Sequence, residues 1–388
     1  MPASSSKDKD TFVVRHIGFW LVSILVGCLA GGISGYVAAK SVAGGLDSRL
    51  SQLWSRVTTP VTPATSTQSN TEILPLEAAR RPVYPAVFAN RVASPLIPVI
   101  RKTGLKLADP MMLPADRIQG YGVSLTSDGW IVLPSAAVGT TVVADVGVVW
   151  QSRVYPVTQL VRDGSTNLTF LKIAATSLPV TNFVSPLDVV PGLGVWTEIE
   201  PRHFRPETIV ATDARATRDA TLSERVNRRF LLSSADRAIR PGVAVWGSNG
   251  GLIGLVVSTD ATGASVIPTT AISSALSQVL AARPIQRSAL GLRVQDVSSL
   301  VYEGVKTDWP SQGILVRQVL STSTATFLQE GDIIERIDRD AFDGIVDLGE
   351  RLLEYRPGTT VTLQGTRKGK SFQVDLPLQA TTTGEIVK

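Results

Sequence analysis

Cysteine and histidine are scarce in this chain of 388 residues, which contains one cysteine and two histidines. A single cysteine cannot form a disulfide within the chain, so any folded domain must rest on its hydrophobic core. The same scarcity argues against a zinc site of Cys and His ligands, and we expect no metal and no cofactor. The net charge of +5 is spread along the chain without a long run of lysine and arginine. This pattern gives no support for nucleic acid as a partner.

Hydrophobic residues make up 44% of the chain and charged residues 18%. This composition is typical of globular domains and excludes a largely disordered chain. The length predicts two or three domains.

Residues 17–39 lack charged side chains and are long enough to cross a bilayer as a tilted helix. Three basic residues, Lys7, Lys9 and Arg15, precede this run, and the first two after it are Lys40 and Arg49. Basic residues are thus slightly more frequent before the run than directly after it. This bias favours a cytoplasmic segment 1–16. We therefore expect a single-pass anchor in a bacterial cell membrane, with the remaining domains on the extracytoplasmic side.

Two alternatives to an uncleaved anchor exist. The run could be a cleaved signal peptide, although the apolar region of such peptides is normally shorter. Residues 25–28, Leu-Val-Gly-Cys, also look like a bacterial lipobox, which would make Cys28 a lipidated N-terminus. Gly27, Gly31 and Gly35 share one face of the expected helix, and small residues at this spacing allow close packing of two membrane helices.

The composition changes twice after the expected anchor. Residues 40–81 read as a juxtamembrane segment followed by a linker rich in Thr, Pro and Ser. Residues 82–283 contain short β-branched runs separated by turn residues, which indicates an all-β barrel or sandwich closed by a helix over 270–282. The expected strands are 96–100, 122–125, 129–133, 141–149, 168–173, 194–199, 208–211, 230–233, 252–257 and 264–267.

Residues 284–380 follow a different order of elements, and 381–388 are expected to be a C-terminal tail. Strands are expected at 290–292 and 313–319, and the run Leu-Gln-Glu-Gly-Asp-Ile-Ile follows at 328–334. A helix is predicted over 346–355, because apolar residues recur at helical spacing and Pro357-Gly358 ends the run. This order resembles a PDZ domain of the type found in bacterial proteases.

The middle section resembles the trypsin-like serine proteases of the HtrA family. Residues 235–246 read Ala-Asp-Arg-Ala-Ile-Arg-Pro-Gly-Val-Ala-Val-Trp, where the family has Thr-Asp-Ala-Ala-Ile-Asn-Pro-Gly-Asn-Ser-Gly-Gly. Residues 120–138 and 163–173 match the family's histidine and aspartate runs in the same way. The resemblance covers residues 82–378 and implies a mostly β chain with a trypsin-like double β-barrel followed by a PDZ domain (α+β).

None of the three positions of the implied catalytic triad has the side chain that catalysis requires. Ala136 stands for the histidine, Asn167 for the aspartate and Ala244 for the nucleophilic serine. A methyl group can neither attack a carbonyl nor accept a proton. The chain is also about three residues shorter than the family pattern between Gly242 and Gly254, so the serine position is either replaced or deleted. Either alignment removes the glycine-rich turn of an oxyanion hole.

Other side chains could in principle supply a non-standard catalytic set. His203 is expected in a surface loop, and Lys172 could form a dyad with a serine. The neighbouring hydroxyls are Ser233, Ser234 and Ser248. The carboxylates of Asp128, Asp163 and Asp236 occupy turn or framework positions of the family pattern. Several arginines make this region basic, which would attract acidic peptides or simply form a solvated surface: Arg225, Arg228, Arg229, Arg237 and Arg240.

The resemblance implies a peptide-binding site in the C-terminal section. PDZ domains accept an extended C-terminus as an added strand, and the amides of one loop hold its carboxylate. By resemblance that loop is Ala289-Leu290-Gly291-Leu292, and the opposite wall is the helix face with Leu348 and Leu352. These leucines would shape a pocket for a hydrophobic terminal residue, or they would simply fill the core.

The expected function is therefore a membrane-anchored, inactive HtrA-like serine-protease homologue. It would bind exposed or C-terminal peptide segments, including unfolded segments, of envelope proteins as scaffold, regulator or holdase. A non-catalytic partner of an active HtrA paralogue and an endopeptidase with a non-standard catalytic set are the alternatives. Relatives of this type often form trimers through aromatic residues before the first barrel, where this chain has Tyr84 and Phe88.

Overall fold

The computed structural model describes residues 85–89, 94–103, 115–234, 236, 239–300, 310–384 and 386–387. Within these ranges, no helix has both the length and the apolar character needed to cross a membrane. The expected anchor at 17–39, with Cys28, lies outside the described residues, as do the linker and Tyr84.

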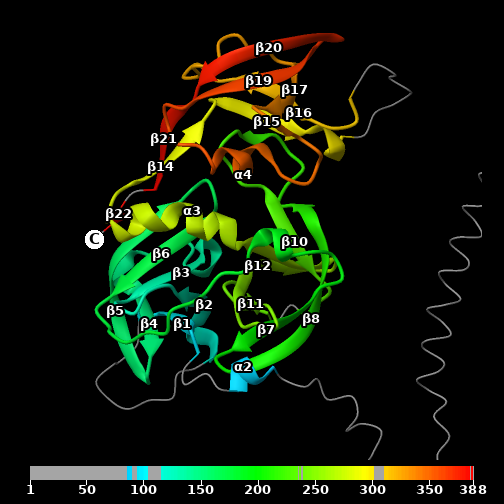
Figure 1. Ribbon diagram of the computed structural model, residues 1–388. Helices are drawn as coiled ribbons and strands as arrows, with labels where there is room; N and C mark the ends of the chain where they lie inside the picture. Colours follow the sequence, from blue (N-terminus) through cyan, green and yellow to red (C-terminus); the bar gives the residue numbers. More distant parts are fainter. Residues whose placement is uncertain are drawn as a thin grey trace, which may run out of the picture. The chain divides into compact units, whose positions relative to one another are not determined.

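The first part of the described chain is a closed six-stranded barrel (Figure 1). Five antiparallel pairings connect its strands in the order β5-β4-β1-β2-β3-β6, and β5 also pairs with β6 to close the ring. A short helix, α2 (Ala86–Ala89), precedes the barrel. The strands are β1 (Leu96–Arg101), β2 (Ile118–Ser124), β3 (Trp130–Pro134), β4 (Val146–Trp150), β5 (Arg153–Asp163) and β6 (Leu168–Ile173).

The next part forms a second closed barrel, with strand order β10-β13-β12-β11-β7-β8. The helix α3 (Thr269–Leu280) follows it and buries Ala271, Ile272, Ala275 and Val279. The strands are β7 (Gly194–Glu200), β8 (His203–Arg215), β10 (Arg228–Leu232), β11 (Ala244–Trp246), β12 (Leu252–Asp260) and β13 (Gly263–Pro268). The trypsin-like double barrel expected from the sequence is therefore confirmed.

The C-terminal section builds a separate antiparallel sheet with the order β20-β19-β17-β16-β15, to which β18 adds beside β17. The helix α4 (Leu348–Leu352) follows β18 and is shorter than the predicted 346–355. The strands are β15 (Leu292–Asp296), β16 (Ile314–Val319), β17 (Ile333–Ile337), β18 (Asp340–Ala341), β19 (Thr360–Arg367) and β20 (Lys370–Pro377). Sixteen buried residues, among them Leu290, Leu348 and Leu352, form one hydrophobic cluster in this section.

Two further ladders involve the end of the chain. The strand β14 (Ile285–Ala289) pairs with β21 (Gln379–Gly384), and β22 (Ile386–Val387) pairs with β5 of the first barrel. The segment 381–388, expected to be a tail, thus contains strand residues that return to the first barrel.

The two barrels share a hydrophobic core. One buried cluster includes Tyr121 and Phe170 of the first barrel together with Phe230 and Trp246 of the second. Phe88 joins this cluster by stacking on Phe204, with 4.5 Å between ring centroids. Because Phe88 is only 4% exposed, most of its surface already packs within the chain.

The carboxylate of Asp163 connects the first barrel to the segment that leads into the C-terminal sheet. Arg287 on β14 donates to Asp163 at 2.5 Å, and the hydroxyl of Thr383 on β21 donates at 2.8 Å. Thr166 and the backbone N–H of Ser165 donate to the same carboxylate at 2.9 and 3.1 Å. Each oxygen of the Asp163 carboxylate thus accepts two hydrogen bonds from groups within the fold.

We expect Arg287→Met to lower the free energy of unfolding by about 3–5 kcal/mol, because it leaves a buried carboxylate without its cation. Both side chains of this ion pair are almost fully buried. Urea unfolding of the full chain in detergent, followed by circular dichroism, measures the change. The double variant Asp163→Asn with Arg287→Met should recover part of the loss. A loss below about 1 kcal/mol would match an exposed ion pair and contradict this assignment.

Candidate functional site: a degenerate protease centre and a peptide groove

Two of the three expected triad positions lie next to each other in the first barrel. Ala136 is exposed on the 3-10 helix η3 (Ser135–Ala137), and Asn167 ends the turn before β6, with φ of 58°. The backbone N–H of Ser135 donates to the carbonyl of Asn167 at 2.8 Å, and the hydroxyls of Ser135 and Thr169 are 2.9 Å apart. The fold thus brings these two positions together, but they carry a methyl group and a carboxamide.

The third position, Ala244, has a different environment. It is the first residue of β11, is 0% exposed, and faces Glu198 on β7 and Leu255 on β12 across the ladder. A nucleophile must instead sit on an exposed turn, with its oxygen open to substrate. This geometry favours the alignment in which the nucleophile turn is deleted over the one in which the serine is replaced.

The loop before β11 leaves no open pair of amides at Gly242 and Val243. Gly242 N donates to the carbonyl of Val256 at 2.7 Å, and Val243 N donates to the carbonyl of Arg240 at 3.3 Å. Gly242 has φ of +89°, and a Cβ there would lie 1.6 Å from the carbonyl oxygen of Tyr121. The loop is therefore packed directly on β2, and both of these amides already have acceptors within the chain.

The loop also uses its other polar groups internally. The carbonyl of Pro241 accepts from Tyr121 N at 2.9 Å, and the guanidinium of Arg240 donates to the carbonyl of Ile118. Arg237 lies outside the described residues.

The alternative catalytic side chains do not meet. His203 is an exposed residue that pairs with Glu200 at 3.2 Å, and Lys172 pairs with Asp128 at 2.6 Å. The Lys172 hydrogen bond lowers the pKa of the Asp128 carboxyl.

The neighbouring hydroxyls and Asp236 have other partners. Ser233 donates to Glu207 at 3.0 Å, whereas Ser234 and Asp236 both accept from Arg205 at 2.8 Å. Ser248 lies exposed in the turn 247–250. Among the described residues, no group of three His, Cys, Asp or Glu side chains could hold a metal ion.

The expected peptide-binding residues come together in the C-terminal section. Ala289 ends β14, Leu292 begins β15, and Gly291 between them has φ of +68°. A Cβ on Gly291 would lie 2.7 Å from the Cα of Ser323, so only glycine fits this close approach. Leu290, Leu292, Leu348 and Leu352 belong to one buried cluster. The loop and the α4 face thus form adjoining apolar walls.

A short strand that the sequence did not predict occupies the free edge of β15. This strand, β9 (Thr221–Leu222), belongs to the connection between β8 and β10 of the second barrel. It pairs antiparallel with β15, with Leu222 opposite Arg293 and Thr221 opposite Val294. A strand of two residues is too short to show the alternation of apolar and polar residues that predicts a strand. The sequence therefore could not predict β9.

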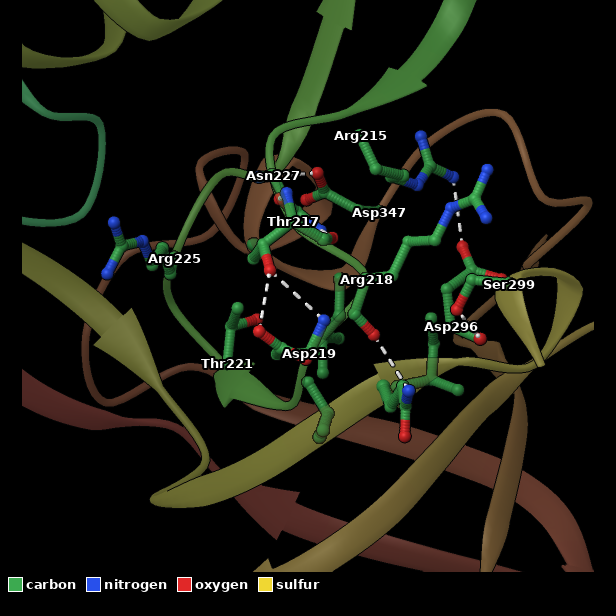
Figure 2. A pocket seen from close by; sticks show the side chains of 15 residues that line it. Arg215, Thr217, Arg218, Asp219, Thr221, Arg225, Asn227, Asp296, Ser299 and Asp347 are labelled. Carbon is green, nitrogen blue, oxygen red and sulfur yellow. Dashed lines mark hydrogen bonds and ion pairs between the residues drawn. The ribbon is translucent and has the colours of Figure 1, made fainter.

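Ser223, which follows β9, contacts the expected carboxylate-binding loop directly. Its backbone N–H donates to the carbonyl of Leu292 at 2.9 Å, and its hydroxyl accepts from Leu290 N at 3.2 Å. An amide of the loop is thus already bound to an oxygen of the chain itself. Figure 2 shows this region, where a cavity of about 20 Å³ remains between the 217–227 connection, β15 and α4.

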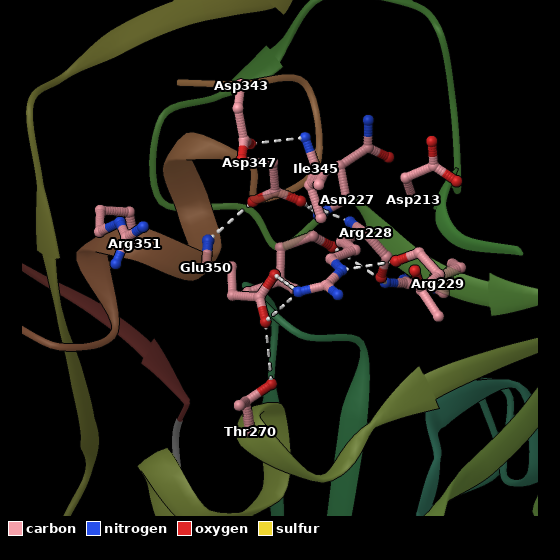
Figure 3. Close-up of polar contacts among 12 residues, drawn as sticks. Asp213, Asn227, Arg228, Arg229, Thr270, Asp343, Ile345, Asp347, Glu350 and Arg351 are labelled. Atoms are coloured by element: carbon pink, nitrogen blue, oxygen red, sulfur yellow. Dashed lines mark hydrogen bonds and ion pairs between the residues drawn. The ribbon is translucent and has the colours of Figure 1, made fainter. Parts of the chain in front are cut away.

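Polar contacts hold the end of the same connection on the N-terminus of α4 (Figure 3). Asp347 caps the helix by accepting from Glu350 N at 2.7 Å, and it also accepts from Asn227 N at 2.7 Å and from Arg228 N. Arg228 forms an ion pair with Glu350 at 3.3 Å, and Thr270 donates to Glu350 at the same distance. Burial raises the pKa of Glu350.

Arg229 is the second buried cation of this cluster. Its guanidinium donates to the carbonyls of Val226 and Arg228, at 3.2 and 2.7 Å. Burial lowers its pKa to about 10. These arginines therefore serve internal contacts of the fold, whereas Arg225 is exposed.

The sequence is similar to known periplasmic proteases, and the C-terminal section matches a known domain. Residues 288–378 match the family profile of the PDZ domain. The chain is 20% identical over 152 residues to a DegP-like periplasmic serine endoprotease of Bartonella henselae, which covers 39% of this chain and 29% of that protein. It is 27% identical over 150 residues to the periplasmic pH-dependent serine endoprotease DegQ of Escherichia coli, covering 37% and 33%.

Each of these matches spans about a third of the relative's length. Among solved structures, the HtrA-type protease AlgW with a decapeptide aligns with a TM-score of 0.54 and 18% identity, over 76% of this chain and 98% of that one. The chain therefore contains a PDZ domain, is homologous to the DegP and DegQ proteases and has the HtrA-type fold.

Restoring the triad side chains should not restore peptidase activity. In the triple variant Ala136→His, Asn167→Asp and Ala244→Ser, the new hydroxyl would lie in the buried strand β11, out of reach of substrate. We expect release of labelled peptides from unfolded casein to stay at the uncatalysed background. The double variant without Ala244→Ser is the control, and thermal melts show that both variants fold. Cleavage by the triple variant alone would contradict the strand assignment of Ala244.

Proposed function

We propose that this chain, which joins an HtrA-type double barrel to a PDZ domain, is a serine-protease homologue without peptidase activity that binds peptide segments of envelope proteins. Its ligands are C-termini or exposed unfolded segments, and its role is that of scaffold, regulator or holdase. The single observation that carries the loss of activity is the position of Ala244, fully buried inside β11.

Three features support peptide binding by the C-terminal section. Gly291 holds the 289–292 loop in a turn with φ of +68° that packs closely on Ser323, and the backbone amides of such a turn can bind a carboxylate. The apolar walls formed by Leu290 and by Leu352 of α4 suit a hydrophobic terminal side chain. The solved relative AlgW, whose structure includes a decapeptide, shares the fold.

The location that we propose follows from the sequence. Residues 17–39 serve as a single-pass anchor in the bacterial cell membrane, and the barrels and the PDZ domain lie on the extracytoplasmic side. The periplasmic relatives support this location. A homotrimer remains part of the proposal, although most of the Phe88 surface is already buried within the chain.

We expect a peptide that ends in a free hydrophobic C-terminus to bind, and its C-terminal amide to bind at least about tenfold more weakly. The amide lacks the charge that makes hydrogen bonds to loop amides strong. Fluorescence anisotropy of a labelled hexapeptide Ser-Gly-Ser-Thr-Leu-Val, titrated with the full chain in detergent, measures both affinities. Replacing the terminal Val by Asp is the matched control for the pocket. Equal binding of acid and amide would contradict the proposed carboxylate loop.

On the protein side, Leu290→Glu places a charge in the apolar wall and should abolish binding of the free-acid peptide. Because Leu290 is fully buried, Leu352→Ala, which only shortens the opposite wall, is measured beside it. Leu352→Ala should weaken binding of a peptide ending in Phe or Leu more than of one ending in Ala. Thermal melts show whether each variant remains folded.

A further inference from the structure

The groove of the PDZ domain is already filled by a segment of the same chain. Residues 221–223 lie along β15 as an added strand, which is the position that an extended peptide takes when it binds a sheet edge. The serine hydroxyl on Leu290 N stands where a ligand carboxylate oxygen would accept. The remaining cavity of about 20 Å³ has room for about one water molecule and not for a peptide.

The opposite wall of the groove is covered by the same connection. Gly349 of α4 lies so close to the carbonyl of Arg225 that a Cβ would come within 2.1 Å of its oxygen. This close approach requires the absence of a side chain at position 349. The connection therefore passes between β15 and α4 with backbone contacts on both sides, as a bound peptide would.

Charged contacts fix both ends of this connection on the PDZ domain. At one end, Arg215 forms an ion pair with Asp296 at 2.9 Å (Figure 2). Arg215 also donates to the carbonyls of Gly344 and Ile345. At the other end, Asn227 and Arg228 donate to Asp347 (Figure 3). Val226 N also donates to the carbonyl of Ser165, two residues before Asn167.

We propose that residues 219–226 are a built-in competitive ligand that keeps the peptide groove closed, and that a C-terminal peptide binds only after displacing them. This inference rests on the proposed peptide-binding function of the groove. The apparent association constant for a peptide is then the intrinsic constant of the open groove multiplied by the fraction of molecules in which the groove is open. Displacement would also break the hydrogen bond between Val226 N and the carbonyl of Ser165.

A substitution that weakens the closed state should tighten peptide binding. Ser223→Pro removes both the N–H that reaches Leu292 and the hydroxyl that reaches Leu290. Loss of these two hydrogen bonds should raise the affinity for the hexapeptide Ser-Gly-Ser-Thr-Leu-Val about tenfold. Ser248→Pro, in the exposed turn 247–250, is the matched control. Its affinity should equal that of the wild type.

A covalent lock tests the reverse effect. Leu222 and Arg293 are exposed and lie opposite each other. The neighbouring Ser223 and Leu292 are joined by a hydrogen bond, so the Leu222–Arg293 pair is the type whose Cβ atoms lie close. In a Cys28→Ser background, Leu222→Cys with Arg293→Cys should form a disulfide on mild oxidation. The oxidised full chain should lose at least about tenfold in affinity for the hexapeptide and regain it on reduction.

The outcomes separate the two proposals. Two results would overturn only the proposal that residues 219–226 close the groove. One is failure of the cysteine pair to cross-link in the folded chain. The other is equal peptide affinity of the wild type, Ser223→Pro and the locked form. Peptide binding would then remain as a function of another surface or of an open groove. If no variant, including Ser223→Pro, bound the free-acid hexapeptide or its Phe-ended form, the proposed peptide-binding function would be wrong. The proposal that residues 219–226 compete with a peptide would then be wrong as well.

Discussion

The buried carboxylate of Asp163 is the contact on which the arrangement of the described chain depends. It accepts from Arg287 at the entry to the PDZ domain, from Thr383 on the returning strand β21, and from two groups of its own turn. A buried charge with these donors holds its neighbours in one geometry, because each lost partner leaves a costly unsatisfied group. The turn so held presents Asn167 and, through the carbonyl of Ser165, binds Val226. One ion pair thus connects the turn of Asn167, the strand β21 near the C-terminus and the 217–227 connection.

The proposed loss of catalysis and the proposed closed groove both rest on particular connections within an HtrA-type fold. Both barrels close in the expected way and share one core. The nucleophile loop, in contrast, is shortened until Ala244 enters β11, and its amides turn inward to Val256 and Arg240. The connection between β8 and β10 reaches the PDZ domain and pairs with β15. We interpret these differences as a change from peptide hydrolysis to peptide binding. Residues 219–226 of the second barrel would compete with the peptide for the groove of the PDZ domain.

Much of the fold could be predicted because its strands are rich in β-branched and apolar residues. The strand 168–173 was predicted with the bounds that the structure shows, and both barrels were expected in chain order. The long strand β5 was missed because Pro156 and the exposed polar residues Arg153 and Thr158 interrupt its apolar pattern. The helix α4 is shorter than its apolar spacing indicated. In the proposed peptide site, Leu290 and Gly291 were predicted from the family pattern, whereas the proposed role of Ser223 depends on a contact between residues 67 positions apart.

Hydrogen exchange of the full chain with and without saturating hexapeptide tests this account most directly. The amide of Ser223, which donates to Leu292, reports on the closed groove, and the amides of β15 report on whichever strand lies beside it. If a peptide replaces the internal segment, exchange at residues 221–223 should speed up markedly while β15 stays protected. Unchanged or slower exchange at 221–223 with peptide bound would contradict the account, because ligand and segment would then occupy different places.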